Sequence, residues 1–453
     1  MDFLLERFAA AEEMEAFVHN GKSYSYSWLL KKIGVYSDFL RKESIQIGEI
    51  TMLVSDYSPQ TFALFCALML NKNIVVPMTT ESIVERETTL TLSECSRIFQ
   101  FTKDLDSITI ETIPQKIRTA ENNLLVNFLQ RESSGILLFS SGSTGKPKGI
   151  LIDFNAMLKK FETKRDKIRS ISFLMFDHFG GINTIFHILS NLGTVITVSN
   201  RSIEEICSAI QKHKVELLPT TPSFLNMLVQ SRAHEHFDLS SLKLITYGTE
   251  VMSQTTLDLV REIFPNVKLQ QTYGLSELGV LRSKSREDGS LWVKIGGEGF
   301  QTKVVDGVLW IKSDFAMVGY INAPNPFDDD GWFCTQDSVE VDGDYFRILG
   351  RTTDIINIGG QKVYPTEVEN VISKIGNIKE VSVRGESNPL LGQIVVAEIV
   401  TNEPEPLSDI KMKVRKACSE ALAPFKVPSK IVLSDRDMYS KRMKKIRKEE
   451  EQI

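Results

Sequence analysis

Apolar and polar residues alternate with two different periods along the first half of the chain. Residues 25–42 repeat apolar positions at helical spacing, whereas residues 49–55 (EITMLVS) form a short apolar run typical of a buried strand. A second helical segment and a second strand follow at residues 58–72 and 73–78. The same alternation returns at SFLMF, TIFHILSNLG, TVITVS, SIEEICSAIQKHK, VELLP and SFLNMLVQSRAHEHF. Strands that alternate with helices predict an α/β fold with parallel sheets covered by helices on both faces.

From about Leu291 onward the pattern changes to short strands separated by Asp-Gly and Gly-Asp turns. These strands predict a small antiparallel barrel or sheet. After Gly350 the pattern changes again, to a helix, two strands and a second helix. We therefore predict a large N-terminal domain, residues 1–350, with parallel α/β subdomains and a small β-barrel, followed by a small, mobile α+β C-terminal domain, residues 351–453.

Composition narrows the class of protein. The chain has 453 residues, more than one hydrophobic core usually organises, and its 42% hydrophobic and 25% charged residues are ordinary for a soluble protein. A net charge of -5 gives no reason to expect nucleic acid or an anionic membrane as partner. No apolar run has the length of a membrane span, and the acidic N-terminus is unlike a signal peptide. The five cysteines have no paired spacing, which argues against disulfides or a zinc site. We predict a cytoplasmic enzyme.

The loop FSSGSTGKPKGI, residues 139–150, has the chemistry of an anion site. It is not a GxxxxGK[ST] P-loop, because Ser140 replaces the first glycine and Pro147 stands where Ser or Thr would hold magnesium. It also runs from one strand into another, and a helix begins only at about Asp153. Two glycines allow backbone N–H groups to converge on one anion, and hydroxyls and lysines add donors and charge. The candidate residues are Ser140, Ser141, Gly142, Ser143, Thr144, Gly145, Lys146 and Lys148. A flexible Ser/Gly surface hairpin is the alternative.

The stretch SSGSTGKPKG resembles the signature of the acyl-adenylate-forming enzymes. This family includes acyl-CoA synthetases, the adenylation domains of nonribosomal peptide synthetases, and luciferases. The resemblance implies ATP-dependent activation of a small carboxylic acid as an acyl-adenylate. The acyl group would then pass to the thiol of coenzyme A or of a carrier protein's phosphopantetheine. ATP and Mg²⁺ are the implied cofactors, with the loop on the departing phosphates.

Two further motifs follow in the family's order. QTYGLSE resembles its Y-G-x-[ST]-E motif, which implies that Tyr273 lies at adenine and that Glu277 holds Mg²⁺, with Thr144 as a second ligand. A turn with a solvated glutamate would be the alternative for this motif alone. GWFCTQD resembles GW[FY]-x-TGD, which implies that Asp337 binds the ribose hydroxyls. Gln336 replaces the usual glycine there, so we expect a changed backbone at this position.

The longest match is GRTTDIINIGGQKVYPTEVE. It implies that Arg351 contacts the nucleotide, that Asp354 is the hinge of the small domain, and that Gly359 and Gly360 enter the site for thioester formation.

The run YSKRMKKIRKEE resembles the family's last motif, which implies that Lys445 is the catalytic lysine. Lys444 occupies the usual glycine position, and Lys441, Lys444 and Lys448 are rivals. A solvated basic tail is the alternative.

The acid substrate is the vaguest part of the prediction. FDHFGGINT occupies the place of a pocket motif, and we align His178 with the pocket histidine of the acyl and aryl branch, whereas Asp177 would suit an amino acid. An Asp-His pair that caps a helix is the alternative. TYGTE departs from the commoner GGE, which predicts a different pocket floor. By family position, the substrate-lining candidates are His178, Phe224, Gly248, Thr249, Thr272 and Gly274.

Several functions stay open at this point. A fatty, aryl or small oxo acid fits the motifs, and an amino acid is less favoured. A stand-alone amino-acid adenylation enzyme is therefore one alternative. Another is a degenerate relative that binds nucleotide or an acyl or peptidyl carrier protein without turnover, for which Gln336 and Lys444 are the support. A phosphotransferase is disfavoured because no Ser or Thr follows Lys146.

Overall fold

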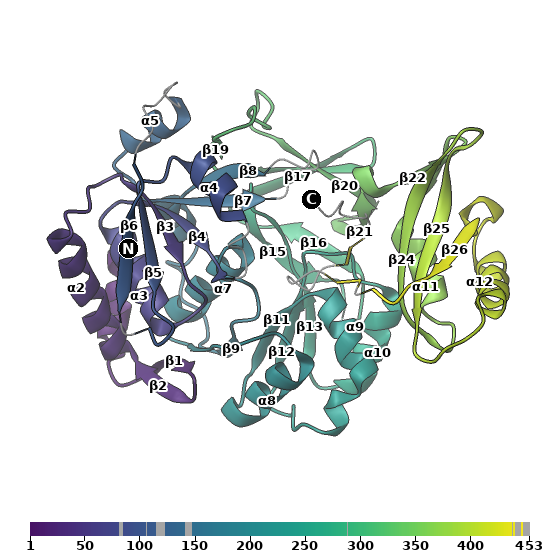
Figure 1. Ribbon diagram of the computed structural model, residues 1–453, viewed down its shortest axis with the longest axis horizontal. Coiled ribbons are helices and arrows are strands. Elements are labelled where there is room, and N and C mark those ends of the chain that lie inside the picture. Colours follow the sequence, from purple (N-terminus) through teal and green to yellow (C-terminus); the bar gives the residue numbers. More distant parts are fainter. Residues whose placement is uncertain are drawn as a thin grey trace.

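A computed structural model describes most of the chain (Figure 1). The described residues are 1–80, 85–105, 107–114, 123–140, 147–287, 289–436, 438–439 and 445–446.

Two sheets of mixed direction form the large N-terminal part. The first has the order β19-β8-β7-β4-β3-β5-β6, with parallel pairing at β7-β4-β3-β5 and antiparallel pairing at its edges. Its strands are β3 (Ile50–Val54), β4 (Ile74–Met78), β5 (Arg97–Phe101), β6 (Ile108–Thr112), β7 (Gly135–Ser140), β8 (Lys148–Asp153) and β19 (Gly319–Tyr320). Every residue of β3 and β4 is buried, as expected for parallel strands covered on both faces.

The second sheet has the order β13-β12-β11-β9-β10-β1-β2 and is parallel except for the β1-β2 hairpin. Its strands are β1 (Glu15–His19), β2 (Lys22–Ser25), β9 (Arg169–Ile171), β10 (Thr194–Ile196), β11 (Leu217–Thr220), β12 (Leu244–Tyr247) and β13 (Lys268–Gln271). The prediction of strands alternating with helices over parallel sheets is thereby confirmed. The predicted strand at SFLMF is wrong, because β9 lies just before it and residues 172–176, most of them buried, lie outside any strand. A short apolar run indicates burial but does not fix which backbone groups pair.

Helices cover these sheets. They are α1 (Asp2–Ala9), α2 (Tyr26–Lys42), α3 (Pro59–Leu70), α4 (Arg86–Ser93), α5 (Asn123–Leu129), α6 (Phe154–Lys159), α7 (Phe179–Ser190), α8 (Ile203–His213), α9 (Pro222–Ser231) and α10 (Gln254–Ile263). Helix α3 begins at Ser58, whose side chain accepts from Thr61 N, and at Pro59, which fits the first turn. It is apolar on nearly all sides because it lies in the main core beside α7. Helix α6 begins at Asp153, as predicted.

An antiparallel sheet follows, with the order β14-β15-β16-β21-β20-β18-β17. Its strands are β14 (Tyr273–Leu275), β15 (Gly279–Ser285), β16 (Trp292–Gly296), β17 (Phe300–Val305), β18 (Val308–Ser313), β20 (Phe333–Asp342) and β21 (Tyr345–Arg351). Its own small core packs around Val293, Leu309 and Ile311. The antiparallel pattern predicted from Leu291 onward is confirmed, and it begins earlier, at Tyr273.

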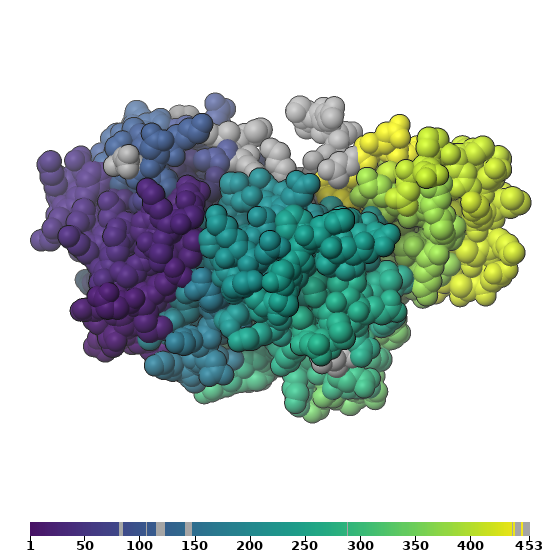
Figure 2. Space-filling view, turned by 90° about the horizontal axis from the view of Figure 1, so that it is seen from below, coloured from purple at the N-terminus to yellow at the C-terminus, as the bar shows by residue number. Residues whose placement is uncertain are grey.

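The C-terminal part is a smaller body at one end of the molecule (Figures 1 and 2). It contains β22 (Ile356–Ile358), β23 (Gln361–Val363), α11 (Pro365–Ile372), β24 (Ile378–Asn388), β25 (Gly392–Thr401), α12 (Leu407–Ala421) and β26 (Lys430–Leu433). Its hydrophobic core is separate from those of the large part. The short turn Thr352–Asp354 joins β21 to this body at the predicted domain boundary, and the hinge role of Asp354 stays a prediction.

No helix in the described part of the chain has the length and apolar character needed to cross a membrane.

Candidate functional site

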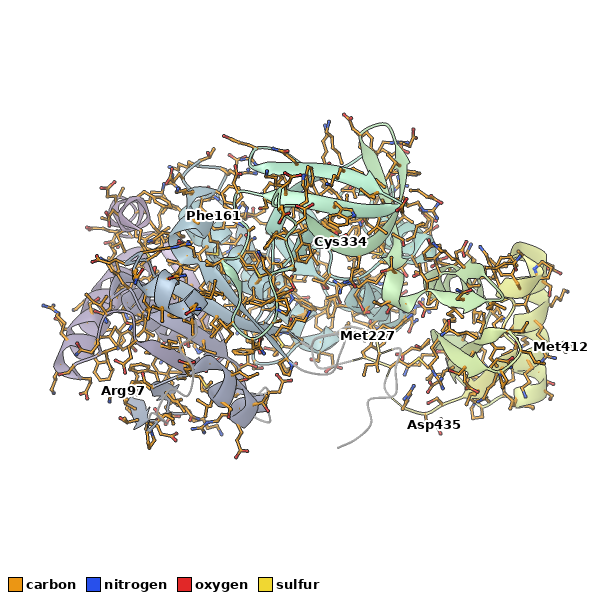
Figure 3. The ribbon with its side chains drawn as sticks, turned by 90° about the horizontal axis from the view of Figure 1, so that it is seen from above. Arg97, Phe161, Met227, Cys334, Met412 and Asp435 are labelled. Atoms are coloured by element: carbon orange, nitrogen blue, oxygen red, sulfur yellow. The ribbon has the colours of Figure 1, made fainter. Side chains whose placement is uncertain are left out.

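A cavity of about 1570 Å³ lies where the parallel sheets meet the antiparallel sheet. Phe161 and Cys334, both labelled in Figure 3, line it from segments that are far apart in the sequence. Many of the predicted site residues line this cavity: Ser140, Lys148, His178, Gly248, Thr249, Thr272, Tyr273, Gly274, Glu277 and Arg351. The structure therefore brings together motifs that are more than 200 residues apart in the sequence.

The predicted phosphate loop is described only at its two ends. Ser141, Gly142, Ser143, Thr144, Gly145 and Lys146 lie outside the described residues. Ser140 and Lys148 pair directly across β7 and β8, so the loop does connect two antiparallel strands, as predicted. Asn322 holds the base of the loop, because its side chain donates to Pro147 O and accepts from Gly149 N, each at 2.8 Å. Sequence analysis missed Asn322, which follows β19 far along the chain.

Glu277 is oriented by a tyrosine that the sequence analysis did not single out. The hydroxyl of Tyr320 donates to Glu277 Oε1 at 2.8 Å, and the amine of Lys148 lies 5.1 Å from the centroid of the Tyr320 ring. Burial, and then the nearby Glu277 carboxylate, raise the pKa of Tyr320 well above its usual value, so the phenol stays a hydrogen-bond donor. Tyr320 thus links the loop's lysine to the predicted magnesium ligand.

The arrangement around Glu277 suits Mg²⁺. Magnesium is usually bound by one or two carboxylates, with water and substrate phosphates completing the octahedron. Within the ranges that the structure describes, no group of three or more His, Cys, Asp or Glu side chains gathers as a metal centre. Glu277 is the candidate ligand, and its Oε2 forms no hydrogen bond with any described residue, which fits a site completed by the nucleotide.

Asp337 lies behind the cavity wall rather than on it. Strands β20 and β21 place it opposite Arg351, whose Nε lies 3.5 Å from Asp337 Oδ1. The hydroxyl of Tyr273 donates to Asp337 Oδ2. Burial raises the pKa of Asp337, and the hydrogen bond from Tyr273 and the charge of Arg351 oppose this rise. Tyr273, the predicted adenine contact, and Asp337, the predicted ribose contact, are therefore hydrogen-bonded to each other.

Two residues on the cavity wall have left-handed backbone where the family pattern has glycine. Gln336 has φ 61° and Thr249 has φ 69°. Gln336 thus adopts a conformation that glycine favours, and the expected backbone change at this position stays a prediction. Gly248, beside Thr249, has no space for a side chain, because a Cβ there would lie 2.4 Å from Thr272 Oγ1. The backbone at Gly248 therefore packs tightly against Thr272, and a pocket floor that differs from the family's stays a prediction.

His178 both caps a helix and lines the cavity. Its Nδ1 accepts from Gly180 N at 3.1 Å at the start of α7, which leaves Nε2 as the protonated nitrogen. Asp177 is buried, and its Oδ2 accepts from Thr79 Oγ1 at 3.4 Å. The hydrogen bond of His178 is that of a helix cap, as the alternative prediction expects. The position of His178 on the cavity wall also fits a role in the substrate pocket.

Phe224 lies elsewhere. Its side chain is fully buried in the core of the second sheet, with its ring 4.7 Å from that of Phe173. It does not line the cavity in this structure. The cause is helix α9, which begins at Pro222 and turns Phe224, the third residue of the helix, toward the core.

Lys445 contacts the large part of the protein through its backbone. Its N–H donates to Glu250 Oε1 at 2.6 Å, and Ser223 Oγ donates to the other oxygen of Glu250. The amine of Lys445 lies 3.3 Å from Glu369 Oε2, a buried carboxylate on α11. In this arrangement the amine is paired within the C-terminal body and does not line the cavity.

The structure describes only some of the other predicted C-terminal residues. The rival lysines Lys441, Lys444 and Lys448 lie outside the described residues. Asp354 ends the short turn between β21 and β22, as a hinge position would. Gly359 and Gly360 form the exposed tip between β22 and β23, both with positive φ.

Comparisons with known proteins identify the family. The family described as "AMP-binding enzyme" matches residues 5–321, and "AMP-binding enzyme C-terminal domain" matches residues 367–444. Acyl-CoA synthetase 7 of Caenorhabditis elegans is 25% identical, over 94% of this chain and 90% of that protein. 2-Succinylbenzoate–CoA ligase of Bacillus pumilus is 24% identical, over 94% and 93%.

Solved structures give the same fold. The anthranilate CoA ligase AuaEII, in complex with anthranoyl-AMP, has a TM-score of 0.83 at 18% identity, covering 98% of this chain and 95% of that one. The first family match alone spans more than half of the residues. The chain belongs to the AMP-binding enzyme family.

Proposed function

We propose that the protein is an acid–thiol ligase. It joins a carboxylic acid to AMP with ATP as donor, and then transfers the acyl group to the thiol of coenzyme A. The observation that carries this proposal is the cavity, in which the ends of the Ser/Gly loop, the Tyr273–Glu277 loop and Arg351 line one space. The names of relatives such as 2-succinylbenzoate–CoA ligase support this type of reaction.

In the first half-reaction, a carboxylate oxygen forms a bond to the α-phosphorus of ATP. The bond from that phosphorus to the bridging oxygen breaks, and pyrophosphate leaves with the electron pair. Two anions must meet, so the main requirement is positive charge and donors that are fixed in advance. When bound, Mg²⁺ neutralises phosphate oxygens.

The chain's own residues supply the rest of this step. Lys148, held over Tyr320 at the base of the loop, contributes charge near the departing phosphates. Tyr320 fixes the carboxylate of Glu277 for the metal. Arg351 and the Tyr273–Asp337 pair form the side on which we put the nucleoside. We assign residues 140–148 as the hydrogen-bond donors to the β- and γ-phosphates.

In the second half-reaction, the thiolate attacks the acyl carbon and AMP leaves. We propose that the C-terminal domain, residues 351–453, turns about Asp354 between the two steps. Lys445 would serve the first step after leaving Glu369, and the exposed Gly359–Gly360 tip would serve the second. A carrier protein's phosphopantetheine is the second candidate acceptor.

ATP–pyrophosphate exchange across a panel of fatty, aryl, oxo and amino acids tests the proposal. We expect exchange with at least one non-amino acid and, with that acid, AMP release that depends on coenzyme A. Exchange with amino acids alone would favour the stand-alone amino-acid adenylation enzyme, for which buried Asp177 would be the partner of the amino group. Nucleotide binding without any exchange would favour the degenerate relative and overturn the proposal.

A further inference from the structure

Lys160 is a partly buried cation on the cavity wall that the proposed chemistry does not use. It follows helix α6, and its side chain amine donates to Asn183 Oδ1 of α7. The amine also lies 5.0 Å from the ring centroid of Phe161 and 5.4 Å from that of Phe179. An amide and two aromatic rings thus surround this amine.

No carboxylate among the described residues pairs with this amine. Within the described residues Lys160 forms no ion pair, in contrast to Lys445, which lies beside Glu369. Arg165 and Lys160 both help burial to lower the pKa of His187 to about 4, and Glu162 and Asp166 line the same cavity without pairing with Lys160. Burial lowers the pKa of Lys160 itself to about 7. A desolvated cation without a counter-ion is unfavourable, and an anion brought in by a ligand would remove that cost.

This position adjoins the loop that carries Glu277. A Cβ placed on Gly279, two residues after Glu277, would lie 3.8 Å from Phe179 Cε1. The ring of Phe179 therefore contacts Gly279 and also lies near the amine of Lys160. His178, the residue before Phe179, lines the same cavity. One continuous wall connects the proposed reacting end of the acid substrate to Lys160.

We propose that Lys160 and Asn183 form a subsite for a second, distal carboxylate of the acid substrate, so that the protein activates dicarboxylic acids. This inference rests on the proposed function and names the substrate class for that same site. One carboxylate is joined to AMP, and the other stays ionised and pairs with the ammonium group of Lys160. The amide nitrogen of Asn183 is a second donor to the distal carboxylate. Phe161 and Phe179 exclude water and so strengthen the ion pair.

The test compares acids of identical skeleton with and without the distal carboxylate: adipate with hexanoate, succinate with butanoate, and terephthalate with 4-methylbenzoate. In ATP–pyrophosphate exchange we expect kcat/KM to be at least about tenfold higher for one diacid than for its partner. Lys160→Met should lower that diacid's kcat/KM by about 10- to 100-fold, the range for a hydrogen bond to a charged group. The monoacid should change by less than about threefold. Asn183→Leu should reduce the same preference.

Controls separate this result from misfolding and from general loss of charge. Lys164→Met removes an exposed lysine that does not line the cavity, and should leave the preference unchanged. Methionine adapts to aromatic neighbours, so Lys160→Met should fold, which the thermal midpoint checks. Equal use of diacids and monoacids by the unaltered protein, or an unchanged preference in Lys160→Met, would overturn the subsite while the proposed function stands.

If no acid supports exchange, the proposed function is overturned, and a binding measurement then tests the subsite. Calorimetry with adipate and hexanoate, without ATP, then decides the subsite by itself. Tighter binding of adipate that Lys160→Met removes would support the subsite. Equal binding of the two acids would overturn it.

Discussion

The two ends of the cavity differ in how their charges are satisfied. At the nucleotide end, Glu277 accepts from Tyr320, and Asp337 accepts from Tyr273 and lies beside Arg351. At the other end, the amine of Lys160 has an amide as its partner and no ion pair among the described residues. At the nucleotide end, which we call the fixed end, hydrogen bonds within the protein set the geometry before any ligand binds. At the Lys160 end, a charge is left that a ligand can neutralise. Changes at the first end should therefore affect all acids alike, and changes at the second should affect particular acids.

The largest effect is expected from a residue that lies at neither end in this structure. Lys445→Ala should lower acyl-adenylate formation by about 1,000-fold or more, because the incoming carboxylate and α-phosphate lose a point charge in the transition state. Thioester formation from a supplied acyl-adenylate should be spared. Exchange measures the first step and thioester release the second.

The matched controls are Lys441→Ala, Lys444→Ala and Lys448→Ala, which should retain exchange. Equal loss of both half-reactions in Lys445→Ala would remove its assignment to the first step. Loss of exchange in one of the other three variants would transfer the role to that lysine.

Glu277→Gln tests the fixed end of the cavity. The amide keeps the shape and a hydrogen-bond acceptor for Tyr320 but loses the charge that would hold Mg²⁺. We expect exchange to fall by about 100- to 1,000-fold, and by the same factor for every acid, as for loss of one transition-state-stabilising group. Glu340→Gln, in a surface pair with Arg347, is the control and should change exchange little. An acid-dependent loss in Glu277→Gln would contradict the division of the cavity into two ends.

The sequence predicted the fixed end better than the other end. Strand–helix alternation follows from side-chain periodicity, and the motifs around Tyr273, Glu277 and Arg351 are local in sequence. Tyr320 and Asn322 were missed because their roles come from the pairing of β19 with β8, a long-range contact. Lys160 was missed because the pair of lysines after an apolar run is typical of a solvated helix end. Burial of the second lysine depends on how α6 and α7 pack, which no local pattern specifies.

The unneutralised charge of Lys160 should be visible in the pH dependence of stability. The pKa of Lys160 is about 7 in the folded protein, below the value of about 10.4 in an unfolded chain. Between these values the unfolded chain holds a proton that the folded protein has released, so the free energy of unfolding rises with pH. Below pH 7 both states are protonated and the folded state carries the full desolvation cost.

Lys160→Met removes this contribution, so its stability should rise less between pH 7 and pH 9. We expect the unaltered protein to gain about 1–2 kcal/mol more than the variant over this interval, as measured by urea unfolding. Burial lowers the pKa of His187 to about 4, so this neighbour does not titrate in the same window. Parallel curves for the two proteins would mean that the amine is solvated, and would weaken the contrast between the two ends.

The smallest effect concerns a property that both ends share. Gln336 near the nucleotide and Thr249 on the pocket floor have left-handed backbone, which costs a non-glycine residue about 1–2 kcal/mol. Glycine removes that cost but adds about 0.4–1 kcal/mol of unfolded-state entropy. Gln336→Gly should therefore raise the free energy of unfolding by about 0.5–1 kcal/mol, and Thr249→Gly by at least as much because threonine is β-branched.

Urea unfolding of both variants measures the gain, and Asn20→Gly is the matched control. Asn20 has φ 50°, a conformation that asparagine tolerates, so its replacement should give no gain. Activity then tells the two positions apart. Since Gln336 lies at the fixed end, Gln336→Gly should leave the preference among acids unchanged. Thr249→Gly should alter this preference, because loss of the threonine side chain enlarges the substrate pocket. Destabilisation by both glycines would mean that each side chain forms contacts worth more than its backbone strain, and that these two departures from the family pattern stabilise the protein.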